Sequence, residues 1–235
     1  MKAKLRVPFF EIGIKNYFYG DQVMDLAKAA DAASKKHDID IILITPYTEI
    51  RRVAEQTGLF VFAPYMDTLR PGRGLADVLP EAVKAAGATG VVLNHCERPM
   101  TLSAMRETID RANELDLLTF ACADTIAETK AVAQLHPDII NPEPSGLIGS
   151  GQISDMGYVM DSIRAIKDIY DDILVEQAAS ISSGDDVYQF IHAGAEAVGA
   201  ASGIANAADP HAMVDEMVAS VRRAWDDRQN SKHSV

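Results

Sequence analysis

The sequence predicts one α/β domain over residues 1–235, a closed (β/α)8 barrel. Eight short apolar runs alternate with eight longer segments of helical pattern, and a unit of about 29 residues is typical of a barrel with little decoration. The apolar runs are continuous and rich in β-branched residues, as expected of parallel strands that are buried on both faces. These observations together favour the barrel.

The predicted elements follow one another in regular order along the chain. The strands are expected at Val7–Ile12, Ile39–Thr45, Leu59–Ala63, Thr89–Asn94, Leu117–Cys122, Asp138–Pro142, Ile173–Gln177 and Ala195–Ala200. The helices are expected at Asp21–His37, Pro46–Thr57, Asp77–Ala86, Ser103–Leu115, Asp124–Leu135, Asp155–Ile169, Gly184–Ala193 and Pro210–Trp225. The polar tail, residues 226–235, is predicted to be frayed.

Capping residues support these helix starts. Aspartates are expected to cap four helices and a fifth one precedes a proline, in the order Asp21, Asp77, Asp124, Asp155 and Asp209-Pro210. An open, doubly wound sheet is the alternative fold. Such a sheet usually carries a G-x-G-x-x-G turn after its first strand, and this chain has Gly13-Ile14-Lys15-Asn16 there.

Composition narrows the class of function. The formal net charge is −12, which argues against nucleic acid or an anionic membrane as a partner. No apolar run approaches the ~20 residues of a membrane span, and the short apolar stretch after the basic N-terminus does not make a signal peptide, so a cytoplasmic protein is expected. The two cysteines, Cys96 and Cys122, form no CxxC pair and predict neither a metal site nor a disulfide framework.

Polar residues follow several of the predicted strands, at the end where barrels carry their functional groups. Lys15 follows the first strand, and His95 and Glu97 follow the fourth. Three loops rich in Gly, Ser and Ala follow the last three strands, at residues 143–151, 178–184 and 201–203. Small residues let backbone N–H groups approach an anion closely, so these loops predict a phosphate site.

Each polar residue also has a purely structural interpretation. Of the six histidines only His95 ends a strand, where it could equally be structural. Glu143 opens a loop with three glycines, as a general base under a closing lid would, although a solvated loop carboxylate is the simpler alternative. Lys15 alone would be a surface lysine, and Glu11, inside the first strand, is assigned no role.

Three motifs occur together in the chain. They are N-H-x-E at residues 94–97, E-P-x-x-L-I-G-S-G at residues 143–151, and Ala201-Ser202-Gly203. With the stretch 77–84, they make the chain resemble the triosephosphate isomerase family, in particular its shorter archaeal-type branch, from about Leu5 to Val221. The resemblance implies the TIM-barrel fold and an isomerase of small sugar phosphates that uses no metal and no cofactor.

The family's mechanism implies a role for each matching residue. Glu143 would be the base that moves a proton between two carbons, and neutral His95 would polarise the carbonyl group. Lys15 would supply positive charge, and Glu97 would hold it in place. The stretch 144–151 would be the lid. Substrate and phosphate would contact Gly13, Gly149, Ser150, Ser180, Ala201, Ser202 and Gly203. The implied substrates are dihydroxyacetone phosphate and D-glyceraldehyde 3-phosphate.

The chain also departs from the family pattern at three places. Gly13 replaces the asparagine that stands two residues before the lysine, Leu75-Ala76 replaces Thr-Gly in the long loop Asp67–Asp77, and Ala178-Ala179 replaces a more glycine-rich stretch. A four-carbon ketose phosphate as substrate, or a phosphate-binding barrel without catalysis, therefore stays open. The resemblance further implies a homodimer or homotetramer in which the long loop enters a neighbouring subunit.

Overall fold

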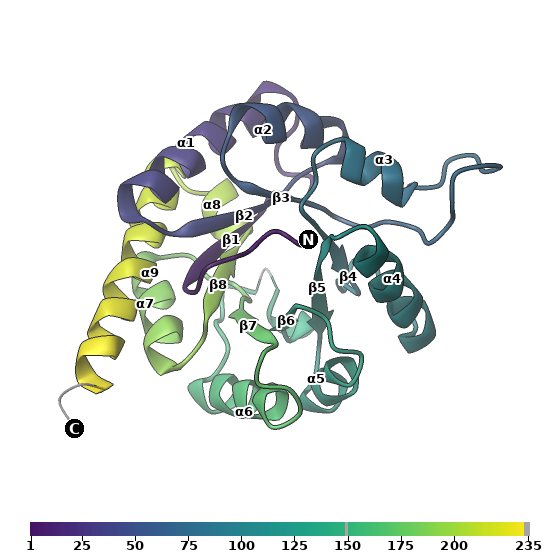
Figure 1. Cartoon of the computed structure of the whole chain (residues 1–235). Coiled ribbons are helices and arrows are strands. Elements are labelled where there is room, and N and C mark those ends of the chain that lie inside the picture. Colours follow the sequence, from purple (N-terminus) through teal and green to yellow (C-terminus); the bar gives the residue numbers. More distant parts are fainter. Residues whose placement is uncertain (149, 233–235) are drawn as a thin grey trace.

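The computed structural model describes residues 1–148 and 150–232, and it confirms the predicted fold (Figure 1). Eight parallel strands close into a barrel in the order β1 to β8. The strands are β1 Phe9–Gly13, β2 Asp40–Ile44, β3 Phe60–Ala63, β4 Gly90–Leu93, β5 Leu118–Ala123, β6 Ile139–Pro142, β7 Leu174–Gln177 and β8 Ala197–Ala200. Closure is made by β1, which pairs with β2 on one side and with β8 on the other.

Helices cover the outside of this barrel. The α-helices are α1 Asp21–His37, α2 Ile50–Gln56, α3 Pro80–Ala85, α4 Leu102–Glu114, α5 Ile126–Ala133, α6 Met156–Lys167, α7 Gly184–Ala193, α8 Ser202–Ala205 and α9 Pro210–Lys232. Two short 3-10 helices, η1 Tyr47–Glu49 and η2 Ser145–Leu147, follow β2 and β6. No helix among residues 1–148 and 150–232 has both the length and the apolar character that crossing a membrane requires.

The core has two parts, one on each face of the sheet. Side chains such as Phe9, Ile42, Phe62 and Phe120 fill the inside of the barrel, and a larger cluster fills the space between strands and helices. A strand buried on both sides gains from apolar residues at every position. This two-sided burial is the reason why the strands read as continuous apolar runs.

The predicted caps are only partly confirmed. Asp155 accepts a hydrogen bond from the Gly157 N–H at 2.8 Å, and Asp209 accepts two from the first turn of α9. The predictions for Asp21, Asp77 and Asp124 are wrong, since Gly20, Leu79 and Thr125 hold those N-cap positions. At the start of α5, Thr125 and Glu128 form a reciprocal capping box, which satisfies two backbone N–H groups at once.

For residues 226–232 the prediction of a frayed tail is also wrong. Helix α9 continues to Lys232, and residues 233–235 lie outside the described part of the chain. Long-range contacts hold the added turns. Tyr188 donates to Asp227 at 2.9 Å, and Arg228 donates to the carbonyl groups of Ile191 and Ala195 at 3.2 and 3.0 Å. These contacts with the α7 region stabilise a segment whose own composition is polar.

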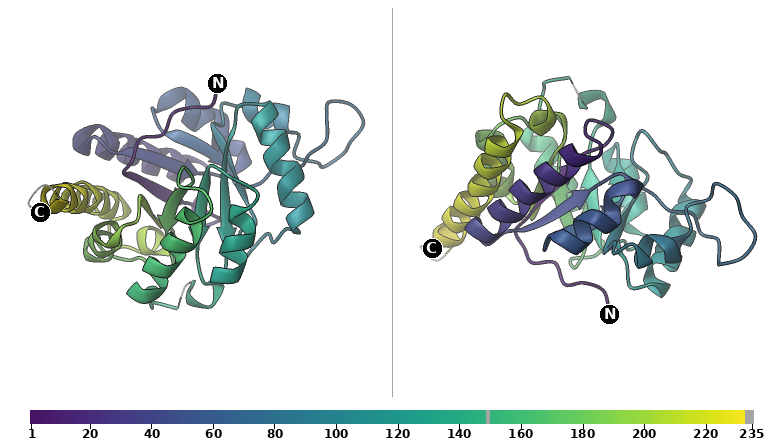
Figure 2. Two further views of the ribbon diagram at one scale, coloured as in Figure 1. Left: turned by 60° about the horizontal axis from the view of Figure 1, so that its bottom comes forward. Right: turned by 90° about the horizontal axis from the view of Figure 1, so that it is seen from above.

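One long connection leaves the body of the barrel. Between β3 and α3 the chain forms an extended loop that projects away from the helices (Figure 2). Its neck is closed by Asp67, whose N–H donates to the Val78 carbonyl group at 3.0 Å and whose carboxylate accepts from the Val78 N–H at 2.7 Å. Within this loop Leu75 is 95% exposed.

Candidate active site

A cavity of about 740 Å³ opens at the carboxyl ends of the strands. Eight of the predicted site residues line it, namely Gly13, Lys15, His95, Glu97, Glu143, Ser180, Ala201 and Ser202. Ser150 and Gly203 are not among its lining residues, and Gly149 lies outside the described residues. Residues that are far apart in the sequence therefore meet at one rim because parallel strands bring all their carboxyl ends to the same side.

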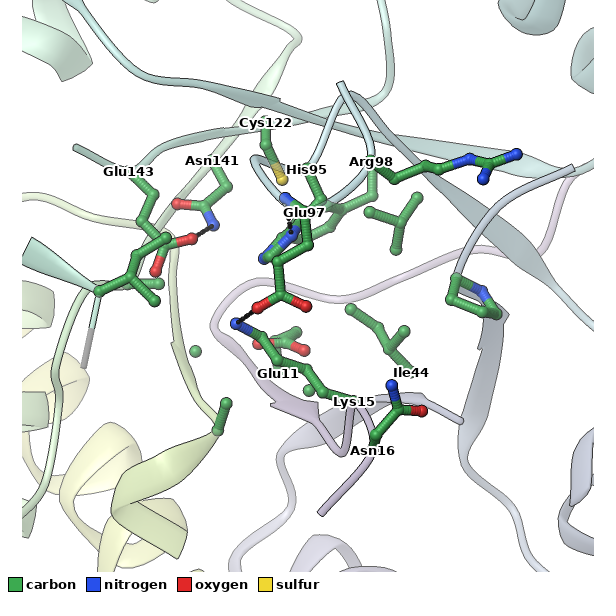
Figure 3. A pocket seen from close by; sticks show the side chains of 18 of the residues that line it. Glu11, Lys15, Asn16, Ile44, His95, Glu97, Arg98, Cys122, Asn141 and Glu143 are labelled. Carbon is green, nitrogen blue, oxygen red and sulfur yellow. Dashed lines mark hydrogen bonds and ion pairs between the residues drawn. The ribbon is translucent and has the colours of Figure 1, made fainter. Parts of the chain in front are cut away.

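Lys15 follows β1 in a left-handed backbone conformation, with φ of 50°. Its Nζ donates to Glu97 Oε1 at 3.0 Å, so the βα loops of β1 and β4 are joined across the site (Figure 3). Partial burial lowers the pKa of the ammonium group, but the ion pair with Glu97 outweighs this effect and the pKa is raised. Lys15 is therefore a fixed positive charge at neutral pH.

His95 is held in one tautomer by its own loop. Its Nδ1 accepts a hydrogen bond from the Glu97 N–H at 3.2 Å, which leaves the proton of the neutral ring on Nε2. Burial, and then the nearby charge of Lys15, lower the pKa of the imidazole. The ring is therefore neutral at pH 7 and can donate a hydrogen bond from Nε2.

The asparagine of the N-H-x-E motif shapes the loop that carries His95. Asn94 has φ of 57°, a conformation that asparagine adopts more readily than most residues. Its side chain donates to the Cys122 carbonyl group at 3.0 Å and accepts from the Met100 N–H at 2.8 Å. The loop is thereby tied to the neighbouring strand β5, and His95 is aimed over the cavity.

Glu143 follows β6 and lines the same cavity, beside Asn141 (Figure 3). Its backbone N–H donates to the Ala123 carbonyl group at 2.8 Å, and its Oε2 accepts from Asn141 Nδ2 at 3.4 Å. Burial raises the pKa of the carboxyl group, although Lys15 and the Ala179 backbone N–H oppose the shift. A carboxylate that is poorly solvated and raised in pKa is a stronger base than one in water.

The loop after Glu143 is anchored at both ends. Ser145 donates to Asp124 from its N–H at 2.8 Å and from its Oγ at 2.5 Å. Ser180 donates from Oγ to the Leu147 carbonyl group at 2.5 Å and accepts from the Gly151 N–H at 3.3 Å. Among the described residues, these two hydrogen bonds of Ser180 connect this loop to the loop after β7, and exchanging them would let it move as a lid.

The loops after β7 and β8 meet beside this lid. Ala179 and Ser180 both have positive φ, 80° and 56°, which is costly for alanine. A Cβ on Gly203 would lie 2.1 Å from the Ile181 carbonyl oxygen, so only glycine lets α8 approach the loop so closely. Helix α8 was not predicted, and its first residue is Ser202. The first N–H groups of a helix have no partner within it, so they can bind an anion.

Three further residues inside the cavity were not predicted from the sequence. Glu11, Asn141 and Cys122 all line it, and each is less than 7% exposed. The alternation of side chains within β1 could have revealed Glu11, because Glu11 shares the inner face of the strand with Phe9 and Gly13. A Cβ on Gly13 would lie 3.0 Å from Glu11 Oε1, so the Glu11 carboxyl group occupies space beside the position where the family has asparagine.

The donor set of this site suits proton transfer. Nowhere in the described ranges do three or more His, Cys, Asp or Glu side chains gather in a way that could hold a metal ion. What the cavity presents is a carboxylate of raised pKa, a neutral imidazole and a fixed ammonium group around one space. This combination can remove a proton next to a carbonyl group and stabilise the charge that develops on its oxygen.

Comparison with known proteins agrees with this geometry. The family model described as triosephosphate isomerase matches residues 9–217. The triosephosphate isomerase of Sulfolobus acidocaldarius is 32% identical over 95% of this chain and 99% of its own length. Those of Methanosarcina mazei and Methanocaldococcus jannaschii are 34% and 33% identical, over 90% and 86% of this chain and over 97% and 94% of their own lengths. The chain belongs to the triosephosphate isomerase family.

Proposed function

We propose that this protein is a triosephosphate isomerase that interconverts dihydroxyacetone phosphate and D-glyceraldehyde 3-phosphate. The observation that carries the proposal is the meeting of Glu143, His95 and Lys15 around one cavity, in a chain of this family. The relatives are named for this activity over nearly their whole length. The reaction needs no cofactor, because one base can remove and return the same proton.

The first step is proton abstraction by Glu143. Its carboxylate takes a proton from C1 of dihydroxyacetone phosphate, the C–H electrons form the C1–C2 double bond, and the carbonyl electrons move to the oxygen on C2. His95 donates a hydrogen bond from Nε2 to that oxygen, and Lys15 stabilises the negative charge. Return of the proton from Glu143 to C2, with proton exchange between the two oxygens through His95, yields the aldehyde.

The phosphate group would lie where the loops after β6, β7 and β8 meet. Candidate donors are Ser180 and the N–H groups of Ser202 and Gly203 at the start of α8, with Gly149 and Ser150 on the lid. Closure of the lid over the phosphate would exclude water. Exclusion of water matters because an enediolate phosphate in water loses its phosphate group, whereas an enclosed one is reprotonated.

The four-carbon substrate is not favoured. Of the three departures that left it open, the change at Gly13 would favour a longer sugar by leaving empty volume, but the carboxyl group of Glu11 lies 3.0 Å from the point where a Cβ would stand there. The non-catalytic alternative is also disfavoured, since the three residues required for proton transfer all line the cavity.

We further infer a homodimer or homotetramer in the cytoplasm. The projecting loop between β3 and α3 carries Leu75, which is 95% exposed, and burial against a second subunit would remove it from water. Cys96 is a free, exposed thiol beside His95, which suits a reducing compartment. Light scattering during gel filtration measures the mass, and Leu75→Asp should shift it towards the monomer.

An enzyme-coupled assay of the purified protein tests the proposed function. We expect rapid turnover of D-glyceraldehyde 3-phosphate and a kcat/KM at least tenfold above that for a tetrulose phosphate. Phosphoglycolate, which resembles the enediolate in charge, should raise the melting temperature more than inorganic phosphate does. Equal stabilisation by the two ligands, with no turnover of either sugar, would identify the protein as a simple anion binder.

A further inference from the structure

Two carboxyl groups lie inside the barrel below the site, and the proposed mechanism uses neither of them. Glu11 on β1 is 6% exposed, and Glu176 on β7 is fully buried. Glu11 Oε1 and both carboxyl oxygens of Glu176 have no hydrogen-bond partner among the residues that the structure describes. A buried carboxylate without partners is very unfavourable, and a proton held by one of two neighbouring carboxyl groups would relieve this cost for both.

The two side chains converge on Gly199 of β8, the strand that lies between β7 and β1. A Cβ on Gly199 would stand 2.0 Å from Glu176 Oε1 and 2.3 Å from Glu11 Oε2. The distance between Glu176 Oε1 and Glu11 Oε2 therefore cannot exceed the sum of these two distances, so the two carboxyl groups lie side by side. Glycine at position 199 provides the space, and three adjacent strands together build the pair.

Little positive charge surrounds this pair. Below it, the barrel interior is apolar, with Phe9, Ile42 and Ala197 among its residues. The titratable groups that face the pair from other parts of the barrel are Glu143, Lys15 and Cys122. Lys15 is the cation of this set, and its ammonium group is already paired with Glu97 at 3.0 Å.

We propose that Glu11 and Glu176 share one proton and together hold a single negative charge beneath Glu143, as positioning residues that keep this base strong. The protonated carboxyl group donates to the ionised one and supplies the hydrogen bond that neither finds elsewhere. The effect of the pair on Glu143 rests on the proposed function, whereas the proposal of a shared proton does not.

Charge interactions support this arrangement in direction. Burial raises the pKa of Glu11, and the Glu143 carboxylate raises it further. Burial likewise raises the pKa of Glu176, followed by the charges of Glu11 and Glu143. Burial and the charge of Glu97 raise the pKa of Glu143, and because interactions between charges are mutual, a negative charge on the pair would raise it further. Two neighbouring carboxyl groups of this kind titrate as a unit, and the second proton leaves only at higher pH.

Substitution of glutamine for glutamate removes the charge of the side chain and keeps its shape. In Glu11→Gln or Glu176→Gln, the amide stands in for the protonated carboxyl group and donates to the remaining carboxylate, so the single charge persists. The double variant has no charge. We expect the acid limb of kcat/KM against pH to stay in place in both single variants. In the double variant it should move to lower pH by about one unit, because Glu143 loses a neighbouring negative charge.

Glu49→Gln is the matched control. Glu49 is a 9% exposed carboxylate on η1, outside the barrel interior, and its substitution should leave the acid limb unchanged. Ionisation of the substrate phosphate is common to all variants and cancels in the comparison. An acid limb of wild-type position in an active double variant would overturn the role of the pair towards Glu143.

Protein stability tests the shared proton without any activity measurement. Above the ordinary glutamate pKa of about 4.3, the unfolded chain holds no proton at these positions and the folded wild type holds one. The folding equilibrium constant of the wild type should therefore fall about tenfold per pH unit from this source, until the pair loses its proton. Each single variant should lack this contribution between pH 6 and 8. Identical pH slopes for wild type and single variants would overturn the proposal.

Infrared spectroscopy gives a second measurement, and its first result does not need the pair variants. In Glu143→Gln at pH 7, the catalytic carboxyl group is absent, so a protonated carboxyl C=O band must arise from another buried acid. We expect one such band, and its loss when Glu11 and Glu176 are both replaced by glutamine. If the pair variants fail to fold, absence of the band in Glu143→Gln alone still overturns the proposal.

Discussion

The two ends of the barrel satisfy their polar groups in different ways. Where strands begin, charges are paired: Lys2 with Asp138 at 2.6 Å, Arg6 with Asp40 at 2.7 Å, and Lys167 with Glu196 at 2.7 Å. Where strands end, side-chain oxygens of Glu11, Asn141 and Glu176 lie buried, with no hydrogen-bond partner among residues 1–148 and 150–232. One end is built for stability, and the other keeps unpaired polar groups close to the cavity. Substitutions at the two ends should therefore separate activity from stability.

The largest expected effect is at the carboxyl end, in Glu143→Gln. Removing the proton acceptor should lower kcat by about 10³-fold, with little change in phosphoglycolate affinity or melting temperature. Steady-state kinetics and isothermal titration measure the two quantities. Glu107→Gln, an exposed carboxylate on α4, is the control and should be fully active. A Glu143→Gln enzyme that keeps more than about a tenth of wild-type kcat would exclude this residue as the base.

At the opposite end, Asp138→Ala should affect stability alone. Asp138 accepts hydrogen bonds from Lys2 Nζ and from the N–H and Oγ1 of Thr119, at 2.6 to 2.8 Å. Its loss leaves these donors unpaired and should cost ~2 kcal/mol, or about 4–8 °C in melting temperature. The kcat/KM at 25 °C should stay within about twofold of wild type, since a stability site does not touch the reacting atoms. A large loss of kcat would break the division between the two ends.

Glu97→Gln probes positioning within the active end. The amide still reaches Lys15 but no longer carries charge, so Lys15 should be held less firmly. Loose placement of a charge near the reacting atoms should lower kcat/KM about tenfold. Glu97 is 60% exposed, so its contribution to folding is small and the melting temperature should barely change. The informative contrary result would be wild-type kcat/KM, which would make Glu97 a bystander.

The smallest effect is expected for Ala179→Gly, which relieves backbone strain at the active end. Alanine at φ of 80° costs about 1–2 kcal/mol. Glycine increases the conformational entropy of the unfolded chain, which lowers the free energy of unfolding by about half that amount. The net gain in the free energy of unfolding should be ~0.5–1 kcal/mol, measured by urea denaturation. Ala32→Gly, at an exposed position within helix α1, is the control and should destabilise by a similar amount. Destabilisation of both would show that Ala179 is not strained.

The acid side of the pH–rate profile depends on Glu143 and His95, two titratable groups at the carboxyl end of the barrel. Catalysis needs Glu143 ionised, and burial raises the pKa of this carboxyl group, so activity should fall as the pH falls through that raised value. The pKa of His95 is lowered, so its protonation comes at lower pH than usual. The profile of kcat/KM for Glu143→Gln should therefore lose the acid limb, apart from ionisation of the substrate phosphate.

Much of this protein could be predicted from local sequence. The eight strands and helix α1 lie where the pattern placed them, because parallel strands buried on both faces must be apolar throughout. Lys15, His95 and Glu143 could be selected because each follows a strand, and the barrel brings all strand ends to one rim. Even the conformational cost of alanine in the strand 7 loop was foreseeable, and Ala179 has φ of 80°.

Other features depend on contacts between distant segments. The last turns of α9 exist because Arg228 and Tyr188 bind across to the α7 region, which no local propensity records. The pairing of Glu11 with Glu176 over Gly199 requires closure of the barrel, since β7, β8 and β1 become neighbours only then. A carboxyl group inside an apolar strand looks anomalous when only the sequence is considered. The surroundings of Glu11, and hence its charge, depend on side chains such as Glu176, which lies more than 160 residues away in the sequence.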